Sequence, residues 1–458
     1  MAKKKEDLLD YGLNASKLTQ FSVEEFFDDS LRLYSAHSNV RGIPFIGDGF
    51  KEAQRKAMWG MLDRGESASI ISVERVSASV ASVTDYHHGI GSMQGTIVGL
   101  AQEFAGSNNV NFLVPDGQFG IRGAHAASAP RYIQTTLHEN FRKIFKKDDD
   151  ILLVQKKVGD LKIEPKFFIP MLPVVLLNGA EGMGTGHSTH IFCYKPDDLK
   201  SCITDVLAGK KLAVRRLTPW WRGFNGIVER DAVTGQVIVK GDFAIDNSTK
   251  IRITELPVGV QTEAYEDHLW KLVDKGVIKR FKNESDKNGF DIIIEAPRTT
   301  TMRPKEELMK LLKLEARDSE NFTVWGPDGN IKKYDSAEHL LTEWVTWRLA
   351  QFEHRRVAHI KQTEETIRFT EESIRFINFY LANVEKFRGC KKEEMIASLV
   401  AEKFTDYNSL LSLPIWSLTA ERIAALAQKL AKEQEKLSQL QGDTANAMFN
   451  RELKDVKF

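Results

Sequence analysis

The segment 336–458 constrains the fold most, because its apolar residues recur at helical spacing over a length that no compact domain contains. The first stripe consists of Leu341, Val345, Leu349, Phe352, Ile360, Ile367 and Ile374. The second places Ile423, Leu426, Leu430, Leu437 and Leu440 at a and d positions, with Glu433 as the one break, and follows Pro414 and Thr419, where a new helix would be capped. Two long helices around a compact segment of roughly 378–418 predict an antiparallel coiled coil with a tip domain. Such stripes indicate packing within a chain more often than a cofactor site.

The region before residue 150 has a different pattern. After a polar N-terminal arm, the segments 50–65, 73–86 and 92–106 each have the spacing of a short helix, and NVNFLVPDGQFGI then reads as a strand and a turn. Three short helices followed by strands favour a winged helix-turn-helix, a module that places one helix in the major groove of DNA.

Residues from about 150 to 335 alternate between strand and helix patterns. The stretches 226–245 and 250–258 are β-branched, alternating and interrupted by glycine, as in antiparallel strands. The stretch 264–281 is predicted to be helical, and 290–296 to return to strand. The chain as a whole is therefore an α+β multidomain protein, as its length of 458 residues also predicts.

Composition narrows the class of protein. With 42% hydrophobic and 28% charged residues, and no apolar run long enough to span a bilayer or act as a signal core, we expect a cytoplasmic protein without membrane contact. The three cysteines (Cys193, Cys202, Cys390) have no metal-type spacing and are expected to be isolated reduced thiols. Net charge is +1, but residues 115–147 hold six Lys or Arg against two acids, which suits a polyanionic partner without proving one.

Several short motifs invite chemical interpretations. His87 and His88 adjoin a glycine-rich break, but no third ligand lies at metal spacing, so capping, packing or acid–base chemistry is favoured over zinc. HGIGSMQG and NGAEGMGTGHST lack the residues of a nucleotide-binding loop and are interpreted as tight turns where the backbone approaches something closely. Asp148, Asp149 and Asp150 are interpreted as a solvated loop rather than a magnesium site, because three consecutive side chains do not converge easily.

The pair Arg131-Tyr132 is the remaining candidate. A tyrosine can form a covalent intermediate when its proton is removed and the developing charge is neutralised. If the electrophile were a phosphodiester, the adjacent guanidinium would match the phosphate oxygens. His88 could then relay a proton while Arg41 and Lys51 clamp phosphates, although the sequence does not show that these residues meet.

Taken in order, the motifs resemble the DNA breakage-reunion part of type IIA DNA topoisomerases, the family that includes the gyrase A protein. IPFIGDGFKEAQRKAMWGM, YHHG, TIVGLAQEFAGSNNVNFLVPDGQFGIR, APRYI and LPVVLLNGAEGMGTGHSTHI carry the resemblance, followed by ITELPVGVQTEAY, WGPDGNIKKYDS and LLSLPIWSLT. Together they cover about residues 25–440. The order of several long motifs is specific, whereas a lone Arg-Tyr pair is not.

The resemblance implies a domain organisation and a set of site residues. It implies an arm (1–40), a CAP-like winged-helix domain with the catalytic tyrosine (41–150), an α/β tower domain (151–335), and a coiled coil with a C-gate dimerisation domain (336–458). Tyr132 would hold the 5′ end of cleaved DNA, with Arg131, Arg41 and His88 stabilising the transition state. The residues implied to contact DNA are Lys51, Arg55, Lys56, His87 and Arg122, with Met171 or Leu172 as an apolar wedge between base pairs.

The resemblance also implies partners. Magnesium and ATP would be bound by an acidic Toprim site and an ATPase domain, neither of which has a motif in this sequence, so no metal is expected on this chain and a gyrase B-like ATPase-Toprim subunit is expected as partner. A homodimer would supply two tyrosines. With no wrapping domain in the sequence, relaxation and decatenation are expected rather than negative supercoiling, and the chain is most similar to the medium subunit of a tailed-phage enzyme, acting in the host cytoplasm.

Three residues depart from the family pattern. Glu52 stands where proline is usual, Ile90 replaces the acidic residue that commonly follows YHHG, and Pro130 precedes Arg131. None removes a catalytic group, but Pro130 restricts Ala129 to an extended conformation and bears on how Tyr132 is presented. The alternative function is a DNA-bending architectural protein that has kept the fold and lost the chemistry, which the presence of the Tyr, Arg and His disfavours. An unrelated coiled-coil scaffold would explain only the last quarter of the chain.

Overall fold

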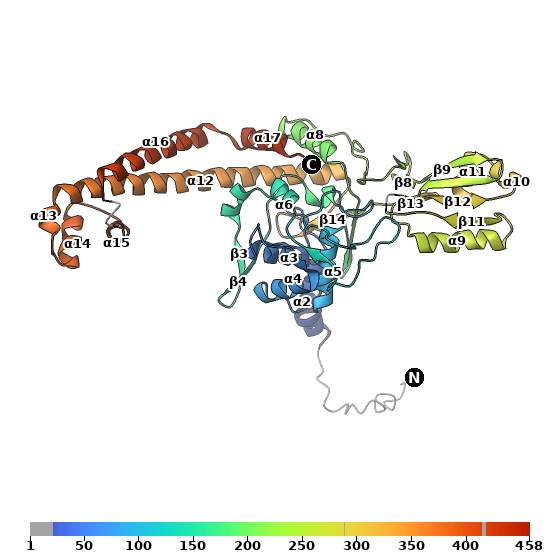
Figure 1. Ribbon diagram of the computed structural model, residues 1–458, viewed down its shortest axis with the longest axis horizontal. Coiled ribbons are helices and arrows are strands. Elements are labelled where there is room, and N and C mark those ends of the chain that lie inside the picture. Colours follow the sequence, from blue (N-terminus) through green and yellow to red (C-terminus); the bar gives the residue numbers. More distant parts are fainter. Residues whose placement is uncertain (1–21, 288, 415–417) are drawn as a thin grey trace, which may run out of the picture.

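The computed structural model describes residues 22–287, 289–414 and 418–458. It is elongated, with a central head, a strand-rich arm at one end and a long helical arm at the other (Figure 1). No helix in the part of the chain that the structure describes is both long and apolar enough to cross a membrane.

The head is built on the three helices expected from the sequence. They are α3 (Glu52–Asp63), α4 (Val73–Val83) and α5 (Ile90–Ala101), which pack on one another and confirm the predicted helical segments. A short antiparallel ladder of β1 (Ile71–Ser72) and β2 (Gln134–Thr135) follows the same unit. This order suits the winged-helix interpretation, which stays a prediction. The other helices of the head are α6 (Glu139–Ile144), the 3-10 helix η4 (Lys147–Leu152), α7 (Val174–Leu177) and α8 (Pro196–Leu207).

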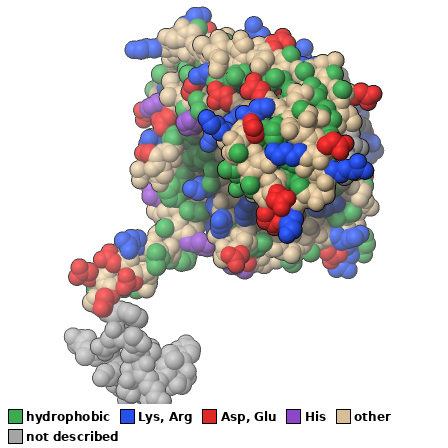
Figure 2. Space-filling model, turned by 90° about the vertical axis from the view of Figure 1, so that its left-hand side faces the viewer, with side chains coloured by type: hydrophobic (Ala, Val, Ile, Leu, Met, Phe, Trp, Pro, Cys, Tyr) green, Lys and Arg blue, Asp and Glu red, His purple; other side chains and the backbone are tan. Residues whose placement is uncertain are grey.

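A helical segment at the N-terminal side projects from the head. It consists of α1 (Val23–Glu25), the π-helix η3 (Phe26–Leu31) and α2 (Arg32–Gly42). Acidic side chains gather on the projecting part (Figure 2), where Glu24, Glu25, Asp28 and Asp29 follow one another. The other end, at Gly42, lies against the head and brings Arg41 close to it.

Three two-stranded antiparallel ladders complete the head. They are β3 (Gln155–Val158) with β4 (Leu161–Pro165), β5 (Ala180–Gly184) with β6 (His187–Ile191), and β14 (Phe322–Trp325) with β15 (Ile331–Tyr334). One hydrophobic core joins all these parts and includes Ile97, Phe112 and Leu176. It also contains Trp344 and Phe449, so the root of the helical arm is anchored inside the head.

The strand-rich arm has its own core. Its four-stranded antiparallel sheet has the order β11-β12-β10-β9, and a three-stranded sheet has the order β13-β8-β7. The strands are β7 (Ile227–Arg230), β8 (Val237–Lys240), β9 (Asp242–Asn247), β10 (Lys250–Glu255), β11 (Arg280–Asn283), β12 (Ile292–Glu295) and β13 (Glu315–Asp318). Helices α9 (Thr262–Asp274), α10 (Arg298–Thr301) and α11 (Lys305–Leu311) pack beside them (Figure 1). The hydrophobic clusters thus subdivide the predicted 151–335 segment, since residues 163–217 contain head-core residues.

The predicted helix 264–281 is wrong at its C-terminal end. Helix α9 stops at Asp274, because Gly276 adopts a φ of +66° and turns the chain out of the helix. Arg280 and Phe281, which the sequence pattern assigned to the helix, belong to the edge strand β11 instead.

The helical arm agrees with the predicted antiparallel pair. Helix α12 (Ala337–Ala382) runs for 46 residues, and α16 (Ala420–Gly442) returns along it (Figure 1). Thr419 caps α16 as expected, its side chain accepting a hydrogen bond from the Arg422 N–H. At the far end α13 (Val384–Phe387), α14 (Lys392–Ala401) and α15 (Tyr407–Leu411) form a tip with a small core of its own. Helix α17 (Ala445–Asp455), which the sequence analysis did not distinguish, docks back onto the head.

Candidate active site

Arg131 and Tyr132 lie on a tight turn that the start of α4 holds in place. The Tyr132 N–H donates to the carbonyl oxygen of Ala129 (2.9 Å), so Pro130 and Arg131 occupy the central positions of a β-turn. Proline is favoured at the first of these positions, because its fixed φ suits the turn. Pro130 therefore pre-forms the loop that presents Tyr132.

The same turn closes the first turn of α4. The N–H groups of Val73 and Glu74 have no partner within the helix, and they donate to the carbonyl oxygens of Ile133 (3.0 Å) and Pro130 (3.2 Å). The Ile133 side chain is buried directly after Tyr132. The backbone on both sides of Tyr132 is thus fixed, while its phenol is 75% exposed. The Arg131 guanidinium lies over the phenol ring, 6.0 Å from its centroid.

A polar pocket of about 450 Å³ gathers three of the predicted residues, Arg41, Lys51 and His88. They come from the end of α2, the N-cap of α3 and the segment before α5. The remaining lining residues are Glu52, Ala53, Gln54, Tyr86, Ser92, Gly95, Thr96 and Gly99. Arg131 and Tyr132 are not among the described residues that line it. Within one chain the structure therefore forms two separate parts of the site, a phenol–guanidinium turn and a basic pocket.

His88 lies at the centre of a group of rings in this pocket. Its imidazole is 5.3 Å from that of His37, 5.3 Å from that of His87 and 5.7 Å from the Tyr86 ring, measured between centroids. Burial lowers the pKa of His88, and the nearby Arg41, His37 and His87 lower it further, whereas Glu52 opposes them. His88 is consequently neutral near pH 7 and able to accept a proton.

Lys51 is oriented by backbone rather than by a carboxylate. Its Nζ donates to the carbonyl oxygen of Glu181 in β5, and burial lowers the pKa of its ammonium. Two glycines permit this arrangement. Gly49 has a φ of +69° and packs directly on Val175, while a Cβ at Gly182 would lie 2.8 Å from Lys51 Nζ. The interpretation of NGAEGMGTGHST as a place of close backbone approach is confirmed here, whereas HGIGSMQG mainly forms α5, where added Cβ atoms would meet open space.

Three residues expected to contact DNA lie in structural ion pairs, which corrects their predicted accessibility. Arg55 is buried and makes a two-pronged pair with Asp48 (2.7 and 3.0 Å). Lys56 is buried and donates to Glu164 (3.0 Å) and to the Thr84 carbonyl (2.7 Å). Their positions on the buried face of α3 leave them no path to a phosphate in this conformation.

Arg122 joins the head to the strand-rich arm in the same way. Its guanidinium donates to Glu255 (3.2 Å) and to the carbonyl oxygens of Leu256 (2.6 Å) and Pro257 (3.1 Å), and it covers the Phe290 ring. The side chain is 9% exposed, so its contacts are used within the chain.

The two candidates for an apolar wedge are also inaccessible. Met171 and Leu172 have no exposed surface and pack in the head core. Insertion between base pairs would require a different conformation around Pro173, and the wedge stays a prediction that this conformation does not support.

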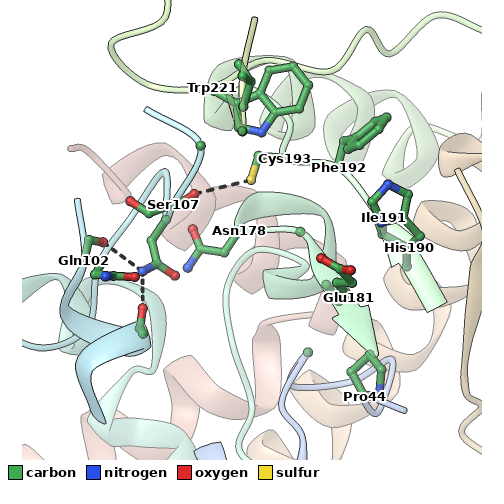
Figure 3. A pocket seen from close by; sticks show the side chains of 18 of the residues that line it. Pro44, Gln102, Ser107, Asn178, Glu181, His190, Ile191, Phe192, Cys193 and Trp221 are labelled. Atoms are coloured by element: carbon green, nitrogen blue, oxygen red, sulfur yellow. Dashed lines mark hydrogen bonds between the residues drawn. The ribbon is translucent and has the colours of Figure 1, made fainter. Parts of the chain in front are cut away.

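A larger cavity of about 520 Å³ adjoins the first and shares Lys51 with it. Figure 3 shows Gln102 and Ser107 on one side of this cavity and Glu181 on the opposite side. Cys193 also lines it and donates weakly to the Ser107 carbonyl (3.7 Å). Burial raises the pKa of the Cys193 thiol to about 12, so it stays protonated and is no nucleophile at neutral pH. The described cysteines are free, as predicted.

The described residues do not fit a bound metal. No three histidine, cysteine, aspartate or glutamate side chains among them gather in a metal-binding arrangement. Glu52 is the only carboxylate among the described residues of the pocket. Asp149, expected in a solvated loop, is instead buried and paired with two arginines of α12, which corrects that interpretation.

Sequence reasoning missed two residues near the pocket. His37 was not considered, although it precedes Arg41 by four residues and therefore lies on the same face of α2. Glu52 was noted only as a departure from the family pattern, although its position beside Lys51 places it in the pocket.

Comparisons with known proteins agree with this geometry. A family model for the A subunit of DNA gyrase/topoisomerase IV matches residues 41–455. The mitochondrial DNA topoisomerase 2 of Dictyostelium discoideum is 31% identical over 99% of this chain and 36% of its own length. The DNA topoisomerase 2 of Meyerozyma guilliermondii is 30% identical over 96% of this chain and 35% of its own length.

A solved structure agrees as well. The DNA-binding, cleavage and re-ligation domain of Plasmodium falciparum topoisomerase II superposes with a TM-score of 0.87 at 30% identity, covering 95% of this chain and 64% of that one. The present chain spans about a third of the length of these curated relatives. The resemblance found in the sequence is confirmed, and the chain belongs to the type IIA DNA topoisomerases, in the family of the DNA gyrase and topoisomerase IV A subunits.

Proposed function

We propose that this chain is the DNA breakage-reunion part of an ATP-dependent type II DNA topoisomerase, with Tyr132 as its nucleophile. The observation that carries the proposal is the exposed phenol of Tyr132 on a fixed turn beside Arg131, in a chain of this family. The phenol oxygen would attack a backbone phosphorus and expel the 3′ oxygen of the neighbouring nucleotide. The tyrosine would keep the 5′ phosphate, and attack by the 3′ hydroxyl would reseal the strand.

The polar pocket has the groups that such a reaction requires. Arg41 and Lys51 would neutralise phosphate charge, and neutral His88 would accept a proton during cleavage and return it during resealing. Arg131 would bind the phosphate under attack. Since Tyr132 lies outside its own chain's pocket, we propose that a homodimer on double-stranded DNA completes the site and supplies two tyrosines for a double-strand break.

Magnesium and ATP are proposed to act elsewhere. Because the described residues hold no metal cluster, we derive no step through a metal on this chain. An ATPase-Toprim subunit would supply both groups, and the assembly would relax and decatenate DNA. We keep the proposal that this is the separate medium subunit of a phage enzyme acting in the host cytoplasm. The architectural alternative has lost its main physical support, since Met171 and Leu172 are buried.

The direct test is to trap and map the covalent complex. The chain is combined with an ATPase-Toprim partner, Mg²⁺ and supercoiled DNA, denatured quickly, digested and analysed by mass spectrometry. The expected result is a phosphotyrosyl peptide containing Tyr132 joined to a 5′ DNA end. An adduct on another tyrosine, or on the 3′ end, would contradict the proposal.

Lys51 and Lys56 provide a matched pair for testing which lysine contacts DNA. Lys51→Ala should lower DNA affinity about equally for different sequences and reduce the salt dependence of binding by about one phosphate contact. Lys56→Met should leave the salt dependence unchanged, because the Lys56 ammonium is committed to Glu164 and the Thr84 carbonyl. Binding titrations at several salt concentrations measure both slopes. Equal slopes for Lys51→Ala and the unmodified chain would remove Lys51 from the interface.

A further inference from the structure

A histidine that the mechanism has not used lies against the proposed proton acceptor. His37 belongs to α2, one helical turn before Arg41, and its ring is 5.3 Å from that of His88 at an interplanar angle of 45°. His88 follows a different part of the chain and precedes α5, so its ring is positioned by packing rather than by its own helix. His87 contacts it on one side and His37 contacts it from α2.

We propose that His37 is a positioning residue for DNA cleavage, which holds the His88 imidazole in the pocket and keeps it neutral. The inference rests on the proposed function and adds a residue to it. Two features of the geometry support it. The ring contact limits how far the His88 imidazole can turn, and the helix that carries His37 also carries Arg41, so α2 places both residues against the same pocket.

The charges around His88 give His37 a second effect. Arg41 and His37 face it from α2, Lys51 and Glu52 from the start of α3, and Tyr86 and His87 from its own segment. Arg41, His37 and His87 each lower the pKa of His88, and Glu52 is the acidic group that raises it. When His37 is protonated it therefore opposes protonation of His88. Removal of that charge should raise the pKa of His88, so that His88 becomes protonated, and unable to accept a proton, at a higher pH.

The test compares three substitutions in the complete assembly with partner, Mg²⁺ and DNA. His37→Phe keeps an aromatic ring and removes the charge, His37→Ala removes both, and His88→Ala is the reference for loss of the proton acceptor. His354→Ala, at an exposed histidine of α12, is the matched control. Single-turnover cleavage is measured from pH 5.5 to 8.5, together with DNA affinity.

His37→Phe should cleave at a rate within about twofold of the unmodified chain at pH 8, with the acidic limb of the profile moved upward by about half a pH unit, as expected for unit charges about 5 Å apart near solvent. His37→Ala should be about tenfold slower at every pH with unchanged DNA affinity, because the imidazole is no longer held in position. The His354→Ala profile should match that of the unmodified chain.

Two results would overturn the inference. If His37→Ala matches His354→Ala in rate and in profile, His37 has no part in cleavage. If His37→Phe is as slow as His37→Ala at every pH, the imidazole itself is required and the residue is not a positioning one. A normal rate for His88→Ala would remove His88 from the mechanism, and the inference with it, while the adduct at Tyr132 would still stand as a separate test of the proposed function.

Discussion

Replacing Tyr132 with phenylalanine is expected to abolish covalent DNA cleavage and relaxation. Phenylalanine keeps the ring and removes only the oxygen that forms the bond to phosphorus. Loss of a covalent nucleophile lowers turnover by a factor on the order of 10⁴ to 10⁶. Folding should be unaffected, because the phenol is 75% exposed and the turn is held by backbone hydrogen bonds that the substitution keeps. DNA affinity should stay within about twofold.

The matched control is Tyr34→Phe. Tyr34 is a similarly exposed tyrosine (68%) on α2, outside the turn that carries Tyr132. Covalent complex trapped with denaturant and relaxation of supercoiled DNA are measured for both variants with the ATPase-Toprim partner. Only Tyr132→Phe should lose both activities. Relaxation by Tyr132→Phe at a normal rate would show that another group is the nucleophile, and loss in both variants would point to a general defect in assembly.

Local periodicity predicted most of the helices and failed where distant contacts decide. The helices α3, α4, α12 and α16 follow from apolar spacing and caps that lie within a few residues of one another. The end of α9 did not, because a strand partner, β12, takes Arg280 and Phe281 into a sheet. Helix α17 was missed since its apolar residues, such as Phe449, are explained by a core formed mainly by residues hundreds of positions earlier.

The candidate site shows the same division. Arg131, Tyr132 and the DGxK segment were found because motif order does not depend on burial. The accessibility of Arg55 and Lys56 was mispredicted, because a basic residue on a helix reads as a phosphate ligand unless its buried partner is known. Lys56 pairs with Glu164, which is 108 residues away. The closeness of His37 to His88 likewise depends on how α2 packs, which no local pattern specifies.

The ion pair between Asp149 and the helical arm should matter greatly for stability. Arg348 has no exposed surface, and its guanidinium donates to Asp149 (2.7 Å). Arg355, also buried, donates to Asp149 (3.4 Å) and to Glu452 of α17. Three segments far apart in sequence, η4, α12 and α17, thus share one buried charge cluster at the root of the arm. The Phe352 ring lies beneath both guanidinium groups and closes the cluster to water.

Asp149→Asn should therefore destabilise the head–arm junction by about 3–5 kcal/mol, since it leaves a fully buried guanidinium without its counterion. Asp150→Asn is the matched control, because the neighbouring Asp150 pairs with Arg142 near the surface and its loss should cost about 1 kcal/mol or less. Denaturant unfolding and amide hydrogen exchange of α17 and of the first half of α12 measure the difference. The double variant Asp149→Leu/Arg348→Met removes both charges and should recover much of the loss, because a buried pair can be replaced by apolar groups at little cost. Equal stability of Asp149→Asn and Asp150→Asn would mean that water or another acceptor reaches Arg348, and the arm would then be held by its apolar packing alone.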